Sequence, residues 1–213
     1  MSPKGRWIAY TTRGETNNAS LSLYDLETRQ SYPVSRGFAD IGSPVFSKDG
    51  KLLFFSASTN AGSFYAGLDM TTQDRPYRAG LYAAVLEADG KSPKAEEGDK
   101  PKKGVTVDAA GLEQQIVSLP MAEAFYTSLA TAKDGSLFAV ENEQPGVAVG
   151  PGSGPARARL MRFDFKERKA DKVADGIVSV STDADGDKLL LATHDGNLVT
   201  SAAGKKLQPK PVN

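Results

Sequence analysis

The chain has 213 residues, no cysteine, and 26 basic and 26 acidic residues that give a formal net charge of zero. The absence of cysteine excludes disulfides, thiolate metal sites and cysteine nucleophiles. Because the charges balance, the sequence shows no excess of positive charge that would indicate binding to nucleic acid or to an anionic membrane. No apolar stretch approaches the about 20 residues of a membrane span. No basic and apolar leader opens the chain, so the sequence indicates no signal peptide and does not identify a compartment.

A short phrase that ends in glycine recurs four times, at residues 2–5, 47–50, 132–135 and 183–186, and a mostly apolar segment follows each copy. The glycines are separated by 45, 85 and 51 residues. Since propeller blades of the WD type contain about 40–45 residues, two intervals match one blade, and the middle interval matches one blade with about 40 additional residues. The repeat predicts an all-β fold, a partial β-propeller of about four blades that are four-stranded antiparallel sheets.

In each unit we expect an inner, a second, a third and an outer strand, in chain order. The first unit lacks the inner strand and has strands at 6–12, 21–26 and 30–34. The later units are complete. Their expected strands are 41–46, 51–58, 81–86 and 114–119 in the second unit, and 126–131, 136–142, 160–165 and 168–173 in the third. In the fourth they are 177–181, a second strand in the apolar run that follows Gly186 and ends before His194, 198–201 and 205–207. Alternating apolar and polar residues in the third strands, as in 21–26 and 160–165, are typical of half-buried strands.

We therefore expect a single partial propeller domain over residues 1–213. The expected blade boundaries are approximately 1–36, 37–120, 121–175 and 176–213, and the expected inserted loops are 60–79, 87–111 and 144–158. The lysine-rich and glutamate-rich part of the second loop, 91–103, mixes both charges without an aromatic residue, which favours a solvated excursion over a nucleic-acid patch.

The chain has one histidine, His194, in the sequence His-Asp-Gly-Asn between two predicted strands. A serine-protease triad requires a histidine that contacts a nucleophile and is oriented by a carboxylate. Asp-Gly between two strands is a strong hairpin signal. The sequence favours a turn over a catalytic site.

Asp183, Asp185 and Asp187 flank the fourth glycine turn and superficially suggest calcium. An EF-hand loop has glycine at its sixth position and a bidentate glutamate at its twelfth, whereas Gly186 is fourth here and His194 is twelfth. The phrase also aligns with the other three turns. A structural turn is favoured, and a weak surface cation site remains the alternative.

The glycine-rich segment 150–155 contains Ser153 but leads into a predicted strand. A phosphate-binding loop would continue with Gly-Lys-Ser/Thr into a helix, and a nucleophile elbow would also precede a helix. We interpret the segment as a flexible connection.

The long loop at 60–79 differs from the others because it combines aromatic, aliphatic and arginine side chains. The residues that we assign to peptide or partner contact are Phe64, Tyr65, Met70, Arg75, Tyr77 and Arg78. Long loops in compact domains are often functional, and arginine and aromatic residues are enriched in contact surfaces. The alternative is that the loop folds back and buries its aromatic residues against its own blade.

At these repeats the sequence resembles the tricorn-type peptidases. The resemblance lies in SPKGRWIAYTTR at 2–13, in GSPVFSKDGKLLFFSAS at 42–58, in the adjoining segment 60–93 and in GKKLQPKPVN at 204–213, and so covers nearly the whole chain. The Ser-x-Asp-Gly-Lys turn is shared with other WD40-like propellers of the PD40 kind, including TolB. The passage from Leu68-Asp69-Met70 through Arg75-Pro76-Tyr77-Arg78 into Leu81-Tyr82 is the more discriminating part.

In that family, propellers precede the domains that carry the catalytic serine, histidine and oxyanion groups. The resemblance therefore implies no catalytic residue, no cofactor and no metal site in these 213 residues. It implies a non-catalytic role in substrate gating, channelling and domain docking. The implied partners are unfolded peptides and the remainder of a serine peptidase.

Two other functions of a propeller remain open from the sequence. The first is a stand-alone interaction scaffold of the TolB or WD40 kind. The second, an enzyme with a site in the propeller channel, is disfavoured by the single histidine. For either propeller we also expect self-association through open blade faces that carry residues such as Trp7, Ile8, Leu189 and Leu191.

Overall fold

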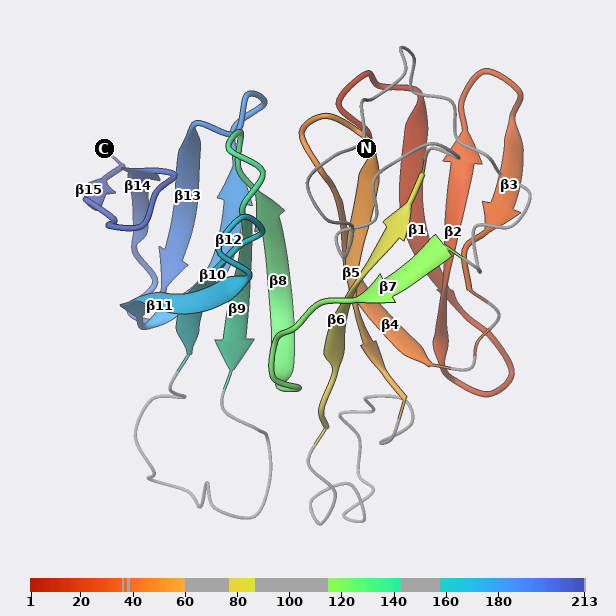
Figure 1. Cartoon of the computed structure of the whole chain (residues 1–213), viewed down its shortest axis with the longest axis horizontal. Coiled ribbons are helices and arrows are strands. Elements are labelled where there is room, and N and C mark those ends of the chain that lie inside the picture. The colour runs from red at the N-terminus through yellow and green to blue at the C-terminus, as the bar shows by residue number, and fades with distance from the viewer. Residues whose placement is uncertain (36, 38, 60–76, 87–114, 143–157, 213) are drawn as a thin grey trace.

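The computed structural model describes residues 1–35, 37, 39–59, 77–86, 115–142 and 158–212. These residues form four antiparallel sheets, which follow one another in chain order from right to left in Figure 1. The predicted all-β class is confirmed. The described residues include no helix that is long and apolar enough to cross a membrane.

The first two sheets differ by one strand. Sheet 1 contains β1 (Trp7–Arg13), β2 (Ala19–Asp25) and β3 (Gln30–Pro33). Sheet 2 contains β4 (Asp40–Phe46), β5 (Leu52–Ser58), β6 (Gly80–Val85) and β7 (Ile116–Ser118). In both sheets the strands lie in chain order, and among the described residues sheet 1 has three strands where sheet 2 has four.

The last two sheets have the complete order. Sheet 3 contains β8 (Phe125–Thr131), β9 (Leu137–Asn142), β10 (Arg159–Asp164) and β11 (Lys169–Asp175). Sheet 4 contains β12 (Ile177–Thr182), β13 (Lys188–Thr193), β14 (Leu198–Ala202) and β15 (Lys210–Pro211).

The predicted outer strand at 205–207 is wrong, because pairing resumes only at Lys210 and Pro211, opposite Thr200 and Val199. Two contacts divert the intervening chain. The Ala203 N–H donates to the Asp187 carbonyl oxygen at 2.9 Å, and the Gln208 N–H donates to Ser201 Oγ at 2.9 Å. The loop between them packs Leu207 against the core instead of pairing it.

The four predicted glycine turns have the same backbone conformation. Gly5, Gly50, Gly135 and Gly186 all have φ between 73° and 87°, a region that side-chain-bearing residues rarely adopt. Each glycine N–H donates to the carbonyl oxygen three residues earlier, over 2.9–3.2 Å. The repeat in the sequence therefore encodes one hairpin connection, used once in each sheet.

Three hydrophobic clusters fill the spaces between successive sheets. Because side chains alternate along a strand, Phe54 and Phe55 of β5 point to opposite faces: Phe55 packs toward sheet 1 and Phe54 toward sheet 3. The largest fully buried side chains across the clusters are Phe54, Phe55, Phe138, Phe163, Leu21, Leu23, Leu53, Leu81, Leu86, Leu137 and Leu160. Burial of each of these side chains contributes about 1.5–3 kcal/mol to the stability of the folded chain. Each sheet is therefore stabilised by its contact with the neighbouring sheet.

Side-chain hydrogen bonds join the inner strands of sheets 2, 3 and 4. Ser43 Oγ donates to the Thr127 carbonyl oxygen at 3.0 Å, and Thr131 Oγ1 donates to the Phe46 carbonyl oxygen at 2.8 Å. Ser128 Oγ donates to the Val180 carbonyl oxygen at 3.0 Å. Strands β4, β8 and β12 therefore lie side by side along one edge of the array.

The expected exposure of Trp7, Leu189 and Leu191 on open faces is wrong. These three side chains are 8%, 0% and 0% exposed, because strand alternation points them into the clusters between sheets. On sheet 4 the opposite face carries Leu190 and Leu198 instead, which are 40% and 49% exposed. On sheet 1, Ile8 is half-buried on the outer face.

Candidate functional site

Two of the six predicted contact residues, Tyr77 and Arg78, lie in the described structure, while Phe64, Tyr65, Met70 and Arg75 lie outside the described residues. Tyr77 is half-buried and Arg78 is exposed. The next residue, Ala79, exchanges two backbone hydrogen bonds with Ala124, at 2.9 and 3.1 Å. The segment is therefore fixed at the junction between sheets 2 and 3.

Tyr77 contacts both of these sheets. Its hydroxyl lies 3.3 Å from Asp40 Oδ2 at the start of β4. Its ring packs edge-on against Phe125 at the start of β8, with ring centroids 5.6 Å apart. Burial and the neighbouring Asp40 charge raise the pKa of Tyr77, so the phenol remains a hydrogen-bond donor.

Asp40 connects this junction to sheet 1, a role that sequence reasoning missed. The residue is 3% exposed. Its Oδ1 accepts the Ala19 N–H at 2.9 Å and lies 3.3 Å from an Arg13 guanidinium nitrogen. A carboxylate with these partners holds three segments together. One feature of the sequence could have indicated this role. The inner strand β4 begins with an acidic residue, whereas the inner strands β8 and β12 begin with the apolar residues Phe125 and Ile177.

Arg78 is an exposed cation of this junction, next to residues that are held in place. Arg78 reaches solvent directly after the buried contacts of Tyr77 and before the paired Ala79. A guanidinium in this position can bind carbonyl oxygens or carboxylates of an extended polypeptide. The described residues that form this junction include no nucleophile and base pair.

The structure confirms that His194 belongs to a turn. Its side chain is exposed, and its N–H donates to the Gly176 carbonyl oxygen at 2.9 Å. Gly196 has φ of 80°, and its N–H donates to the Thr193 carbonyl oxygen at 3.0 Å. Ser153, the other residue considered as catalytic, lies outside the described residues.

Two of the three aspartates of the fourth turn, Asp183 and Asp187, have structural partners. Asp183 Oδ1 accepts the N–H groups of Asp187 and Lys188 at 2.9 and 3.1 Å. Asp187 Oδ2 lies 2.9 Å from Lys133 Nζ. Across the described ranges, no group of three or more histidine, cysteine, aspartate or glutamate side chains could hold a metal ion.

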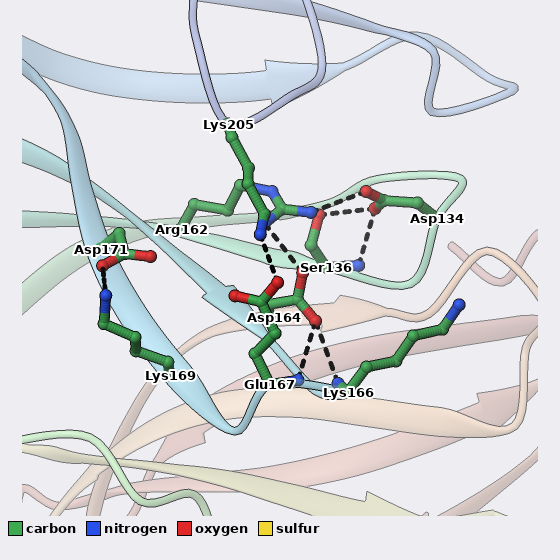
Figure 2. A network of polar contacts seen from close by, with 9 residues as sticks. All are labelled: Asp134, Ser136, Arg162, Asp164, Lys166, Glu167, Lys169, Asp171 and Lys205. Carbon is green, nitrogen blue, oxygen red and sulfur yellow. Dashed lines mark hydrogen bonds and ion pairs between the residues drawn. The ribbon is translucent and has the colours of Figure 1, made fainter.

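A buried arginine organises a second polar network, shown in Figure 2. Arg162 is 6% exposed and lies 2.7 Å from Asp134 Oδ2 and 3.1 Å from Asp164 Oδ2. Burial raises the pKa of Asp134, but hydrogen bonds from Ser136 and Arg162 outweigh it, so the pKa lies below its usual range. Glu167 extends the network to Lys205 in the last sheet.

Sheet 1 has an equivalent pair. Arg6 forms two hydrogen bonds with Asp25, at 3.0 and 2.7 Å. Asp25 accepts the Glu27 N–H and Asp164 accepts the Lys166 N–H, at 2.9 and 3.0 Å. The repeated Asp after an aromatic residue in the third strand is therefore a hairpin-capping and arginine-pairing position. These networks join strands and hairpin turns through ion pairs and hydrogen bonds to the backbone.

The chain is similar along its whole length to tricorn proteases. It is 26% identical over 227 residues to the tricorn protease of Thermoplasma volcanium, a match that covers 100% of this chain and 21% of that protein. It is 27% identical to tricorn protease homolog 1 of Streptomyces coelicolor, over 93% of this chain and 20% of that protein. The chain thus spans about a fifth of the length of these relatives. No family model matches it.

Solved structures give the same fold. The crystal structure of the tricorn protease superposes with a TM-score of 0.73 and 17% identity, covering 100% of this chain and 22% of that one. TolB from Acinetobacter baumannii superposes with a TM-score of 0.62 and 14% identity, covering 98% of this chain and 41% of that one. These neighbours are β-propellers, and the predicted propeller class of the four sheets is confirmed.

Proposed function

We propose that this chain is a non-catalytic β-propeller part of a tricorn-like serine peptidase, which acts in substrate gating and channelling and in docking of the remaining domains. One observation carries the proposal: the similarity to the Thermoplasma volcanium tricorn protease covers all of this chain and only 21% of that protein. A segment of this kind contributes binding surface, while the catalytic groups belong to other parts of the polypeptide.

The junction of Tyr77 and Arg78 suits this role. Strands β4 and β8 hold it through Asp40 and Phe125, so Arg78 is presented by a rigid base. Unfolded polypeptides share exposed backbone carbonyl groups whatever their sequence. An exposed guanidinium at this position contacts such groups without requiring a particular side chain.

Binding of an unfolded protein tests the proposal. The probe is fluorescein-labelled α-lactalbumin that has been reduced and carboxymethylated, and native α-lactalbumin is the folded control. We expect saturable binding of the unfolded form, measured by fluorescence anisotropy. Arg78→Ala weakens it about threefold to tenfold, and Lys166→Ala, which removes another exposed cation, leaves it unchanged. No preference for the unfolded form contradicts the proposal.

A second candidate is a stand-alone interaction scaffold of the TolB kind. It is supported by the superposition on TolB, which covers 98% of this chain. The nucleotide sequence downstream of Asn213 distinguishes the two. A peptidase core in the same reading frame supports the first candidate, and a stop codon supports the second.

A further inference from the structure

The inner strands β4, β8 and β12 are edge strands, because each pairs only with the second strand of its own sheet. An edge strand presents backbone N–H and carbonyl groups that can pair with another chain. Since hydrogen bonds hold these three strands side by side, their edges form one surface, which we call the inner edge. Its backbone groups are occupied, missing or covered.

The hydrogen bonds of β4 show which of its residues face the inner edge. The Ser47 N–H donates to the Leu52 carbonyl oxygen at 2.9 Å, so Ser47 points its backbone groups toward β5. In an antiparallel strand this direction alternates by residue. Phe46 and Pro44 therefore point their backbone groups away from β5, to the inner edge.

The other two inner strands have the same alternation. The Ala132 N–H donates to the Ser136 carbonyl oxygen at 2.9 Å, and the Asp183 N–H donates to the Lys188 carbonyl oxygen at 3.1 Å. The residues that alternate with Ala132 and Asp183 face the inner edge. They are Leu129 and Thr131 in β8, and Val180 and Thr182 in β12.

Hydroxyl groups of neighbouring inner strands occupy several of these backbone groups. Ser128 Oγ donates to the Val180 carbonyl oxygen at 3.0 Å and accepts the Val180 N–H at 3.2 Å, so both backbone groups of Val180 have partners. Thr131 Oγ1 donates to the Phe46 carbonyl oxygen at 2.8 Å. Side chains of β8 thus hold the edges of both neighbouring inner strands.

Strand β4 has two further features at this edge. Pro44 has no N–H, so it cannot donate to an added strand. Ser43 beside it has φ of 51° and donates its Oγ to the Thr127 carbonyl oxygen at 3.0 Å. The other three described residues that carry a side chain and have positive φ lie in hairpin turns. Each inner strand also has a register shift near its start, and such bulges protect sheet edges.

Burial covers the remaining groups of β8. Leu129 and Thr131 are 8% and 1% exposed, so their backbone groups have little or no contact with solvent. In β12, Thr182 is half-buried and follows the occupied Val180 along the edge. An added antiparallel strand requires both an N–H and a carbonyl group on successive edge residues. None of the three described inner strands offers them on two successive edge residues.

We propose that the inner edge prevents strand addition, so that an unfolded polypeptide lying along it is held by side chains only. The polypeptide in this inference rests on the proposed function. Strand addition obtains its affinity from main-chain hydrogen bonds that any sequence can make, so an open edge would retain substrates instead of passing them on. The guanidinium of Arg78 acts differently, because it contacts single carbonyl groups.

A short peptide tests the inner edge for strand addition. The probe is a fluorescein-labelled peptide with the sequence of residues 136–142, which include β9, the antiparallel partner of β8. One modified form is N-methylated at Phe138 and Val140, and the other at Leu137 and Ala139, so each form lacks donors on one side of the strand. For the wild-type chain we expect either no binding or three affinities within about twofold in fluorescence anisotropy. A loss of about tenfold in one methylated form overturns the inference.

The double variant Ser43→Gly, Pro44→Ala opens the edge. It frees the Thr127 carbonyl oxygen and gives residue 44 an N–H, and glycine suits the φ of 51°. We expect this variant to bind the unmethylated peptide about fivefold more tightly than the wild type does, and one methylated form to lose the gain.

Ser179→Gly is the matched control for this double variant. Ser179 stands seven residues before its turn glycine, as Ser43 does, and it is exposed. We expect no gain in peptide binding from this substitution. A double variant that binds the peptide no more tightly than the control overturns the inference.

Amide hydrogen exchange tests the wild-type chain without any substitution. The N–H groups of Phe46 and Thr182 face the inner edge, and saturating unfolded α-lactalbumin should change their exchange by less than about twofold. Slowing by about tenfold or more would show that the polypeptide pairs with this edge. In that case the inference fails, while the proposed function stands. If α-lactalbumin does not bind and the double variant gains methylation-sensitive peptide binding, the protection of the inner edge stands and the proposed function fails.

Discussion

Gly186 combines a left-handed backbone with a position that has no room for a side chain. Its φ is 77°, and an added Cβ would lie 2.7 Å from the Lys133 backbone nitrogen and 3.1 Å from the Ala132 carbonyl carbon. The close approach has a purpose in the fold, because the Lys133 N–H donates to the Gly186 carbonyl oxygen at 3.0 Å. One glycine thus completes the sheet 4 turn and joins it to the sheet 3 turn.

Gly186→Ala is expected to cost about 2–4 kcal/mol of unfolding free energy, because backbone strain adds to a clash with backbone atoms. Gly196→Ala is the control, since Gly196 has φ of 80° with no atom within 4 Å of an added Cβ. It costs only the strain, about 1 kcal/mol. Urea unfolding with an unchanged slope measures both, and equal midpoints for the two variants contradict the role of the close approach.

Asp25 gives the stability of sheet 1 a predictable pH dependence. The Arg6 hydrogen bonds hold the pKa of Asp25 well below its usual range, and the Glu27 N–H adds to this effect. A depressed folded-state pKa contributes stability above the unfolded value near 3.8, and the contribution disappears as the pH falls further. Unfolding free energy should therefore fall below about pH 4. Arg6→Gln should make this decrease shallower, and an identical acid limb in both proteins would exclude the pair as its cause.

At the scale of strands, the links between inner strands determine how the sheets are held together. Ser128 forms two hydrogen bonds with β12: its Oγ donates to the Val180 carbonyl oxygen at 3.0 Å and accepts the Val180 N–H at 3.2 Å. Each inner strand also carries a register shift against its second strand, between Gly42 and Val45 in β4 and between Tyr126 and Ser128 in β8. The irregularity places a hydroxyl-bearing residue where it can reach the next sheet.

Ser128→Ala should destabilise the chain by about 1–3 kcal/mol, because it leaves both backbone groups of Val180 without their partner. Ser179→Ala in β12 is the matched control, since Ser179 is exposed, and its effect should stay within about 0.5 kcal/mol. Thermal unfolding compares the two. A control variant that is as damaging as Ser128→Ala would show that the link between β8 and β12 contributes nothing specific.

The sequence predicted the second and third strands well because a glycine turn and alternating residues are local signals. The outer strand of sheet 4 was misplaced since Leu207 is apolar, and no local signal distinguishes packing against a core from pairing in a sheet. The Asp40 junction joins residues 13, 19, 40 and 77, and the Arg162 network joins residues 134, 162 and 164. Such contacts depend on how the sheets are placed relative to one another. The residue pattern within one strand carries no information about that placement.

For the whole molecule, the order of the sheets leaves the outer faces of sheets 1 and 4 without a neighbouring sheet among the described residues. Leu190 and Leu198 lie on this side of sheet 4 and are 40% and 49% exposed. Exposed apolar area of this kind drives association. We therefore expect the chain to self-associate or, if the proposed function holds, to pack against the remaining domains of the proposed peptidase.

Light scattering over a range of concentrations tests this expectation. The chain should show a mass that rises with concentration, and the double variant Leu190→Lys, Leu198→Lys should reduce the association because it places two cations on the face. A strictly monomeric chain at high concentration would reject the idea. Glu15→Lys serves as a control for charge alone, since it raises the net charge by the same two units and Glu15 is exposed in the turn between β1 and β2.

The central claim, a propeller part that handles unfolded polypeptide without cleaving it, is tested most directly by following one sample for both events. Unfolded α-lactalbumin is incubated with the purified chain, its binding is followed by anisotropy, and its mass is followed by mass spectrometry. The account predicts saturable binding and an intact substrate mass after prolonged incubation. Cleavage products that disappear in Ser153→Ala or His194→Ala would contradict it.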